Sequence, residues 1–314
     1  MNRRDFIAAS ATIAGTAAMG NQGSSGKEKP AMQPIIDTHQ HLWDLSKFKT
    51  NWLTPDSPLG KNYTPIEYAK AIDGLNVVKS VYMEVDVVVE QQQQEADYLL
   101  ELIVSKKTPT VAAVLSGRPA SDQFQKYVDQ FKDLPQIKGI REVIHEKRTP
   151  KGYCLEPAFV KGVQYLGKIN KSFDLCLRPG EIADAMKLVD QCKDTRFILD
   201  HCGNAPLYDE KAFATWQTDI AKIAERPNVV GKVSGIVVQC AGKKWDASIL
   251  APAVKHTIKV FGWDRVMFGG DWPVCTLAAT YAEWVNALKE IVAEFSAENQ
   301  NKLFHDNAAR YYSI

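Results

Sequence analysis

Residues 35–44 read Ile-Ile-Asp-Thr-His-Gln-His-Leu-Trp-Asp, and this stretch sets the interpretation of the whole chain. Its two leading isoleucines form a short apolar run, which is typical of a strand buried in a parallel sheet. Side chains of a strand alternate between its two faces, so His39 and His41 should project together, with Asp37 on the same side one step back. Two imidazoles at one strand end can hold one side of a metal ion or bind a substrate oxygen. An isolated His-x-His can also be two unrelated loop histidines, so the remaining sequence decides between these interpretations.

Short apolar runs alternate with longer amphipathic stretches from residue 35 onward. The runs predict strands at residues 35–41, 78–86, 110–117, 137–145, 173–178, 196–201, 229–234 and 265–271. Apolar residues at helical spacing predict helices at residues 91–107, 122–134, 157–169, 181–192, 211–226, 248–261, 280–293 and 298–309. Eight strands, each followed by a helix, predict an α/β fold of the (β/α)8 TIM-barrel type. The alternative, an open doubly wound sheet, would place a glycine-rich phosphate turn after the first strand, where the two histidines stand instead.

Length and composition indicate an ordinary globular protein. The chain has 314 residues, of which 45% are hydrophobic and 24% charged, and its formal net charge is +1. No basic patch stands out, which argues against a nucleic-acid partner. No linker divides residues 31–314, so we predict one barrel domain over this range. Residues 43–65 form a long loop, which we expect to fold over the mouth of the barrel.

The N-terminus is typical of a targeting signal. Arg3 and Arg4 directly precede a mild apolar run over residues 6–19, a pattern that resembles a twin-arginine export signal. We therefore predict a signal and linker at residues 1–30 and a periplasmic or otherwise exported protein. The apolar run is shorter than the roughly 20 residues that a bilayer span needs, so no stable membrane span is expected after cleavage. A cytoplasmic tail is the alternative interpretation.

In a TIM barrel, functional groups gather at the carboxyl ends of the strands. The polar residues predicted at those ends are His39, His41, Glu84, Arg141, His145, Cys176, Arg178, His201, Lys232, Ser234 and Asp271. Four of the six histidines fall at predicted strand ends, which unrelated loop histidines would not readily produce. Structural alternatives exist: His201 could be a loop residue, Asp271 an N-cap, and Lys232 a partner in an ion pair inside the barrel. The two remaining histidines lie on predicted helices and are expected to be structural.

Six motifs in this order resemble the amidohydrolase superfamily. They are residues 36–44 (IDTHQHLWD), 139–141 (GIR), 199–203 (LDHCG), 232–235 (KVSG), 270–273 (GDWP) and 307–312 (NAARYY). More narrowly, the chain resembles the amidohydrolase-related branch that contains sugar-acid lactonases such as fuconolactonase and rhamnonolactonase. The resemblance runs from about residue 34 to the C-terminus.

This resemblance implies a hydrolase that opens the lactone ring of a sugar acid. Its catalytic residues would be Asp271, His201, His39 and His41, with Asp271 activating water as a general base. The resemblance also implies one divalent metal, with zinc as the first candidate, held by His39, His41, Glu84, His201 and Asp271. The alternative is a reaction without a metal. A site with two metals is not expected, because the later strands offer only His201 where such a site would use two histidines.

Basic and aromatic residues would then bind the substrate. Arg141, His145 and Lys232 would make the pocket positive, which suits a hydroxylated or carboxylate-bearing lactone. Trp43 and Trp272 could stack on an apolar sugar face or pack beneath the mouth loops. Two other functions stay open: a metal-dependent decarboxylase or amide hydrolase of the same superfamily, and a non-catalytic protein that binds sugar acids. The expected partner in each case is a small molecule.

Overall fold

The computed structural model describes residues 32–145 and 149–314. Residues 32–314 group into one compact unit. The predicted export signal at residues 1–30 lies outside the described residues. Within the described ranges, each helix is too short or too polar to cross a bilayer.

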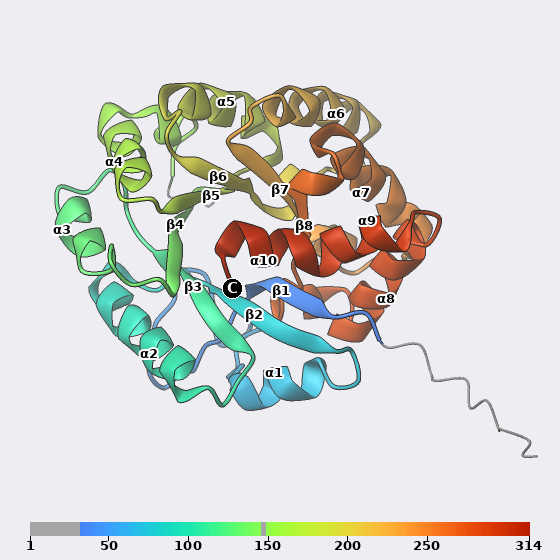
Figure 1. Ribbon diagram of the computed structural model, residues 1–314, viewed down its shortest axis with the longest axis horizontal. Helices are drawn as coiled ribbons and strands as arrows, with labels where there is room; N and C mark the ends of the chain where they lie inside the picture. The colour runs from blue at the N-terminus through green and yellow to red at the C-terminus, as the bar shows by residue number, and fades with distance from the viewer. Residues whose placement is uncertain (1–31, 146–148) are drawn as a thin grey trace, which may run out of the picture. The chain divides into compact units, whose positions relative to one another are not determined.

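Eight parallel strands form the centre of the fold, and each pairs with the next strand of the chain. They are β1 (Ile35–Gln40), β2 (Val77–Met83), β3 (Thr110–Ser116), β4 (Ile137–Val143), β5 (Ser172–Cys176), β6 (Arg196–Leu199), β7 (Val229–Val233) and β8 (Val266–Phe268). A bridge between Gln40 and Trp272 brings the chain after β8 back to β1, where the amide of His41 donates to the carbonyl of Trp272 at 2.8 Å. These contacts close the sheet, and helices surround it (Figure 1). The predicted (β/α)8 TIM barrel is confirmed.

Ten helices lie around the strands or over their ends in the described part of the chain. They are α1 (Pro65–Ala71), α2 (Gln92–Ser105), α3 (Phe124–Asp129), α4 (Pro157–Lys168), α5 (Ile182–Gln191), α6 (Glu210–Ala224), α7 (Ala247–Phe261), α8 (Tyr281–Val292), α9 (Ala297–Asn301) and α10 (Asn307–Tyr312). Short helical turns join them at η1 (Val89–Gln91), η2 (Tyr153–Leu155), η3 (Pro179–Glu181), η4 (Asp200–Gly203), η5 (Ile236–Cys240), η6 (Trp263–Arg265), η7 (Val274–Leu277) and η8 (Lys302–Asp306).

Two helical regions differ from the prediction. The segment predicted as one helix at 298–309 is divided into α9, the π-helical turn η8 and α10. Helix α1 was not predicted, although the sequence carries its signal. Thr64 caps the helix, Pro65 begins it, and the Glu67 side chain accepts from the Thr64 amide, which together form a capping box.

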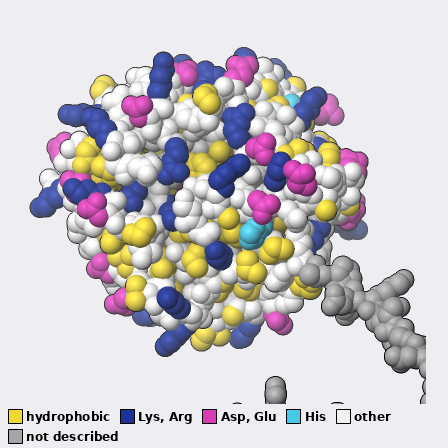
Figure 2. Space-filling model, in the orientation of Figure 1, with side chains coloured by type: hydrophobic (Ala, Val, Ile, Leu, Met, Phe, Trp, Pro, Cys, Tyr) yellow, Lys and Arg dark blue, Asp and Glu magenta, His cyan; other side chains and the backbone are white. Residues whose placement is uncertain are grey.

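Apolar side chains fill part of the barrel interior and the layer between strands and helices. The interior cluster consists of Val81, Met83, Ala112, Val114, Ile198, Val230, Met267 and Tyr312. Helix α10 lies over one end of the ring of strands (Figure 1) and supplies Tyr312 to this cluster. Figure 2 shows the same face, on which basic and acidic side chains are interspersed, in keeping with the small net charge.

Strand β1 departs from regular alternation. Its pairing register with β2 shifts between Asp37 and Gln40. The Asp37 carboxylate accepts hydrogen bonds from Tyr68 of α1 at 2.8 Å and Tyr281 of α8 at 3.0 Å, and so lies toward the helices. The prediction that Asp37 shares a face with His39 is therefore wrong, because side-chain parity is not maintained across an irregular register.

Candidate active site

A cavity of about 390 Å³ lies among the residues that follow the strands at their carboxyl ends. Five predicted site residues line it: His41, Arg141, His145, His201 and Asp271. The other lining residues are Trp52, Val85, Asp86, Val143, Cys176, Leu177, Arg178, Pro179, Asn204, Gly235, Val238, Gln239 and Val274. A cavity with apolar walls and a few convergent polar groups is the usual form of a small-molecule site.

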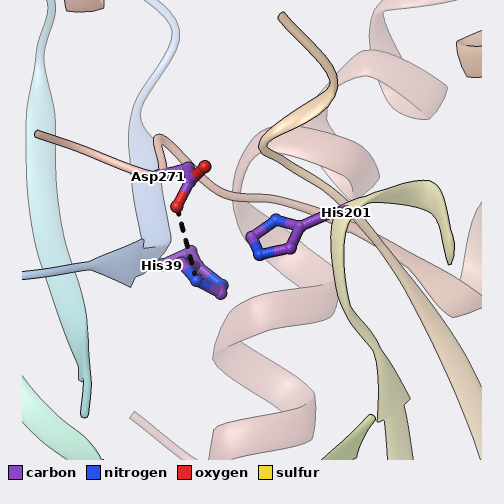
Figure 3. Close-up of side chains that lie close together, drawn as sticks. All are labelled: His39, His201 and Asp271. Atoms are coloured by element: carbon purple, nitrogen blue, oxygen red, sulfur yellow. Dashed lines mark ion pairs between the residues drawn. The ribbon is translucent and has the colours of Figure 1, made fainter. Parts of the chain in front are cut away.

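Asp271 enters this cavity from the turn after β8. Its backbone is left-handed, with φ +53°, and its amide donates to the carbonyl of His39 at 2.8 Å. Such a conformation is uncommon outside glycine and is frequent at functional sites. The carboxylate Oδ1 lies 3.6 Å from His39 Nε2 and 3.4 Å from His41 Nε2, and Figure 3 shows the first of these contacts.

The His41 ring is fixed by its other nitrogen. Nδ1 lies 3.0 Å from the carbonyl oxygen of Met83. Because a carbonyl oxygen only accepts hydrogen bonds, Nδ1 carries a proton, and Nε2 is the nitrogen that faces Asp271. The carboxylate Oδ1 of Asp271 and Nε2 of His41, 3.4 Å apart, are placed to hold a proton or a cation between them. His41 and Asp271 can thus share a proton taken from a substrate or water.

His201 reaches the same point from the turn after β6. Its Nδ1 lies 3.0 Å from the Ser234 hydroxyl, which leaves Nε2 free of this contact. Figure 3 shows the ring beside Asp271 and His39. Gly235 permits this approach, because a Cβ atom there would lie 2.3 Å from His201 Nδ1 and 2.9 Å from Asp271 Oδ2. A glycine is therefore needed at this position, in the turn between β7 and η5.

His39 is fully buried and lies beneath the cavity wall. Its Nδ1 is 3.5 Å from Asp200 Oδ1 and 3.4 Å from Lys232 Nζ, while its Nε2 is 3.2 Å from Arg141 Nη1. Burial holds the pKa of His39 well below its usual range, so the ring is neutral at neutral pH. Charged neighbours on both sides fix the orientation of the ring.

A buried network of ion pairs surrounds His39. Arg141 Nε lies 2.7 Å from Glu84 Oε1, and Lys232 Nζ lies 2.9 Å from Asp174 Oδ2. Asp200 joins the two pairs, at 3.4 Å from Arg141 and 3.1 Å from Lys232. Burial raises the pKa of Asp174 to about 7 against the opposing charge of Lys232. Burial would also raise the pKa of Asp200, but Lys232 and the neighbouring His39 together outweigh it, and the pKa lies well below its usual range.

Three donor atoms in this region suit a divalent metal. One atom each of His39, His201 and Asp271 lies within 4.8 Å of the other two, and two imidazoles with a carboxylate are a typical zinc set. The Nδ1 atom of each histidine also has a partner, Asp200 for His39 and Ser234 for His201, as metal-bound histidines usually do.

The charge of the region agrees with this donor set. The network and Asp271 together contain four carboxylates and two basic groups, namely Glu84, Asp174, Asp200, Asp271, Arg141 and Lys232. His39, which links them, is neutral. A divalent cation would offset the carboxylates that stay ionised, although Asp174, with a pKa of about 7, is only partly ionised at neutral pH. The residues present therefore fit one such ion.

Four residues from the predicted site lie elsewhere. Glu84 is buried against Arg141 instead of with the three candidate ligands. Lys232, predicted to contact substrate, is fully buried in its ion pairs. Trp43 packs edge-on against Trp52, while Trp272 packs against Tyr63 and Tyr68. Neither of these two tryptophans lines the cavity, and both are buried against neighbouring aromatic rings.

Sequence reasoning missed two members of the network, Asp174 and Asp200. Asp174 shares a strand face with Cys176, and a carboxylate within the apolar run of β5 is itself a signal of a buried partner. Lys232 within the equally apolar β7 is the complementary signal. The pairing of the two could have been suggested from these positions.

Comparisons with known proteins agree with this geometry. A sequence model described as amidohydrolase matches residues 36–314. A protein of Burkholderia multivorans named L-fucono-1,5-lactonase is 27% identical over 294 residues, which cover 89% of this chain and 96% of that one. A protein of Scheffersomyces stipitis named L-rhamnono-gamma-lactonase is 21% identical over 336 residues, with 89% and 98% covered.

Solved structures share the fold. A crystal structure of an amidohydrolase from Burkholderia multivorans with bound zinc superposes with a TM-score of 0.79 at 23% identity. The aligned part covers 90% of this chain and 99% of that chain. The superposition extends over the whole barrel.

Proposed function

This chain belongs to the amidohydrolase family, and from that membership we propose that it is a hydrolase of ester bonds that opens the lactone ring of a sugar acid. The observation that supports this proposal best is the position of Asp271. Its carboxylate faces the cavity between two histidine rings, where a water molecule and a bound carbonyl could meet it. The names of the two lactonase relatives supply the substrate class.

In the proposed reaction, Asp271 is the general base. It takes a proton from the attacking water as the new C–O bond forms at the lactone carbonyl. His41 Nε2, 3.4 Å away, shares that proton. The same proton then passes to the ring oxygen as the ester C–O bond breaks, which leaves a hydroxy acid and restores the carboxylate.

Two other cavity residues stabilise the negative charge on the carbonyl oxygen. Arg141 remains charged, because Glu84 and Asp200 raise its pKa despite burial. The His201 ring lies on the opposite side of Asp271 from β1 and can donate or orient through Nε2. Loss of one preorganised donor to such an oxyanion typically costs about 3 kcal/mol of activation free energy.

A divalent metal, when bound, would be held by His39, His201 and Asp271 and would supply Lewis-acid polarisation of the carbonyl. The chain's own residues still orient the ester, exclude water and hold the proton. The cavity suits a hydroxylated ring, because the polar side chains of Asp86, Asn204 and Gln239 line it beside apolar walls.

A hydrolysis screen tests the proposal. The purified protein is assayed against a panel of 1,4- and 1,5-aldonolactones, with and without prior chelation, by following acid release. We expect turnover of at least one lactone, and activity that persists after chelation would remove the metal from the reaction. Binding of lactones without turnover would indicate a binding protein, and carbon dioxide release from aromatic acids without lactone hydrolysis would indicate a decarboxylase.

We also propose that residues 1–30 direct export. The paired arginines Arg3 and Arg4 carry this proposal. Replacement of both by lysine should shift the protein from the periplasmic to the cytoplasmic fraction of a bacterial host. An unchanged distribution would contradict it.

A further inference from the structure

Cys176 ends β5 and lines the cavity, with 1% of its surface exposed. The chain has five other cysteines, and the cavity wall includes none of them: Cys154, Cys192, Cys202, Cys240 and Cys275. The Sγ atom of Cys176 lies 3.3 Å from Nδ1 of His145, which follows the neighbouring strand β4. One thiol is thus placed at the same strand ends as the histidines and carboxylates of the candidate site.

The thiol belongs to a second group of possible metal ligands. Single donor atoms of Cys176, Asp200 and His201 all lie within 4.8 Å of one another. His201 also belongs to the group formed with His39 and Asp271. The two groups therefore meet at one imidazole, and a sulfur donor stands next to the nitrogen and oxygen donors already described.

The shared imidazole is well suited to bind a metal. Ser234 fixes the Nδ1 atom of His201 at 3.0 Å, so Nε2 is the nitrogen available for coordination. The neighbouring Asp200 is itself held by Lys232 at 3.1 Å. Ligands that are already fixed in place lose little freedom when an ion binds.

We propose that Cys176 is a thiolate ligand of the metal site centred on His201, so that the cavity selects a thiophilic divalent ion such as Zn²⁺ or Cd²⁺. Thiolate ligands favour these ions, whereas Mg²⁺ and Ca²⁺ prefer sites made of oxygen alone. The inference concerns which ion the chain binds, and it does not depend on the reaction proposed above.

Coordination requires that the thiol lose its proton. The S–H bond breaks as the sulfur–metal bond forms, and His145 Nδ1, at 3.3 Å from the sulfur, is placed to accept the proton. His145 is exposed and can pass the proton to solvent. One proton is released for each ion that binds in this way, and neither an oxidant nor a reductant is involved.

Spectroscopy of the full chain tests the proposal independently of enzyme activity. The protein is stripped of metal with a chelator and titrated with Cd²⁺ and Co²⁺. We expect a sulfur-to-metal charge-transfer band in the ultraviolet that saturates at one equivalent, and no displacement of Cd²⁺ by excess Mg²⁺. Cys176→Ser should lose this band, while Cys192→Ser, which removes a buried thiol just after α5 and outside the cavity, should retain it.

Affinity and local structure provide two further measurements. Zinc affinity, from competition with a chromogenic chelator, should fall at least about ten-fold in Cys176→Ser, since loss of even an outer partner costs that much. X-ray absorption of the wild-type protein with one zinc should show a sulfur neighbour at about 2.3 Å, and this measurement needs no variant. A zinc shell of nitrogen and oxygen alone, a band unchanged in Cys176→Ser, or no binding of Zn²⁺ or Cd²⁺ would overturn the proposal.

Discussion

Buried carboxylates lie in two regions of this molecule, and they are stabilised by different means. Inside the barrel, Glu84, Asp174 and Asp200 are paired with Arg141 and Lys232. We call these five residues the inner cluster. In the layer between the strands and the helices, the carboxylates of Asp37 and Glu95 receive hydrogen bonds from tyrosine hydroxyls and backbone amides instead.

The two regions differ in whether a basic side chain opposes the effect of burial on the carboxylate pKa. Burial raises the pKa of Asp37 in spite of its hydrogen bonds. Burial, with the negative charge of Glu84 nearby, raises the pKa of Glu95 to about 8. Basic partners in the inner cluster oppose the same effect. The pKa values of Glu84 and Asp200 are lowered there, whereas burial still raises the pKa of Asp174 to about 7.

The largest effect is expected where the inner region meets the cavity. Asp271→Asn removes the proposed base but keeps the shape of the side chain, so kcat should fall about 10²- to 10⁴-fold. Substrate or product binding, measured by calorimetry, should remain. Asp122→Asn, an exposed position, is the matched control and should be fully active. Unchanged turnover in Asp271→Asn would refute the mechanism.

Breaking an ion pair of the inner cluster should cost the most stability. Lys232→Met leaves Asp174 and Asp200 buried with one cation fewer, and the loss of a single partner of a buried pair costs about 3–5 kcal/mol. Chemical denaturation measures this change. Lys187→Met, at an exposed pair on α5, should change stability by less than about 1 kcal/mol. Adding Asp174→Asn to Lys232→Met should recover part of the loss, and a double variant that is less stable still would argue against this assignment.

The effect of the outer carboxylate Glu95 on the free energy of unfolding should depend on pH. The folded-state pKa of Glu95 is about 8, above its ordinary 4.5, so the folded state binds this proton more tightly. That contribution to stability is complete below pH 4.5 and is lost as pH rises through about 8. Glu95→Gln removes the dependence and should gain about 1–3 kcal/mol over wild type at pH 9, with little difference at pH 5. Melting temperatures across this range measure it, and parallel curves for the two proteins would contradict it.

The smallest effect is expected at the other outer carboxylate. In Asp37→Asn, the amide oxygen can still accept hydrogen bonds from the backbone N–H groups of His39 and Gly270. The NH2 group can donate to the hydroxyls of Tyr68 and Tyr281. The unfolding free energy should fall by only about 1 kcal/mol or less. A loss as large as that of Lys232→Met would show that the two regions do not differ as described.

Much of the fold follows from local sequence. The eight strands are short apolar runs, and β1 to β8 all form within a few residues of their predicted positions. The barrel rule then brings His39, His201 and Asp271 together, because strand ends meet at one face whatever their separation in sequence. That convergence required no knowledge of individual contacts.

The remaining details depend on strand register, which the sequence does not specify locally. The shift in β1 turns Asp37 toward the helices, and no residue type in 35–44 announces it. The contact between Cys176 and His145 arises because Val143 pairs with Cys176 across β4 and β5. Whether Lys232 meets a substrate or Asp174 likewise depends on how deep in the barrel its side chain ends, which packing alone decides.

The closure of β8 onto β1 has a consequence for the order in which activity can arise. His39 belongs to the first strand and Asp271 to the turn after the last strand. The backbone amide of Asp271 donates a hydrogen bond to the carbonyl of His39. A growing chain would contain His39, Arg141 and His201 long before it contained the base. Catalysis by this mechanism can therefore begin only after the barrel has closed between β8 and β1, so turnover reports complete folding. A truncation before β8 would retain His39, Arg141 and His201 and remain inert.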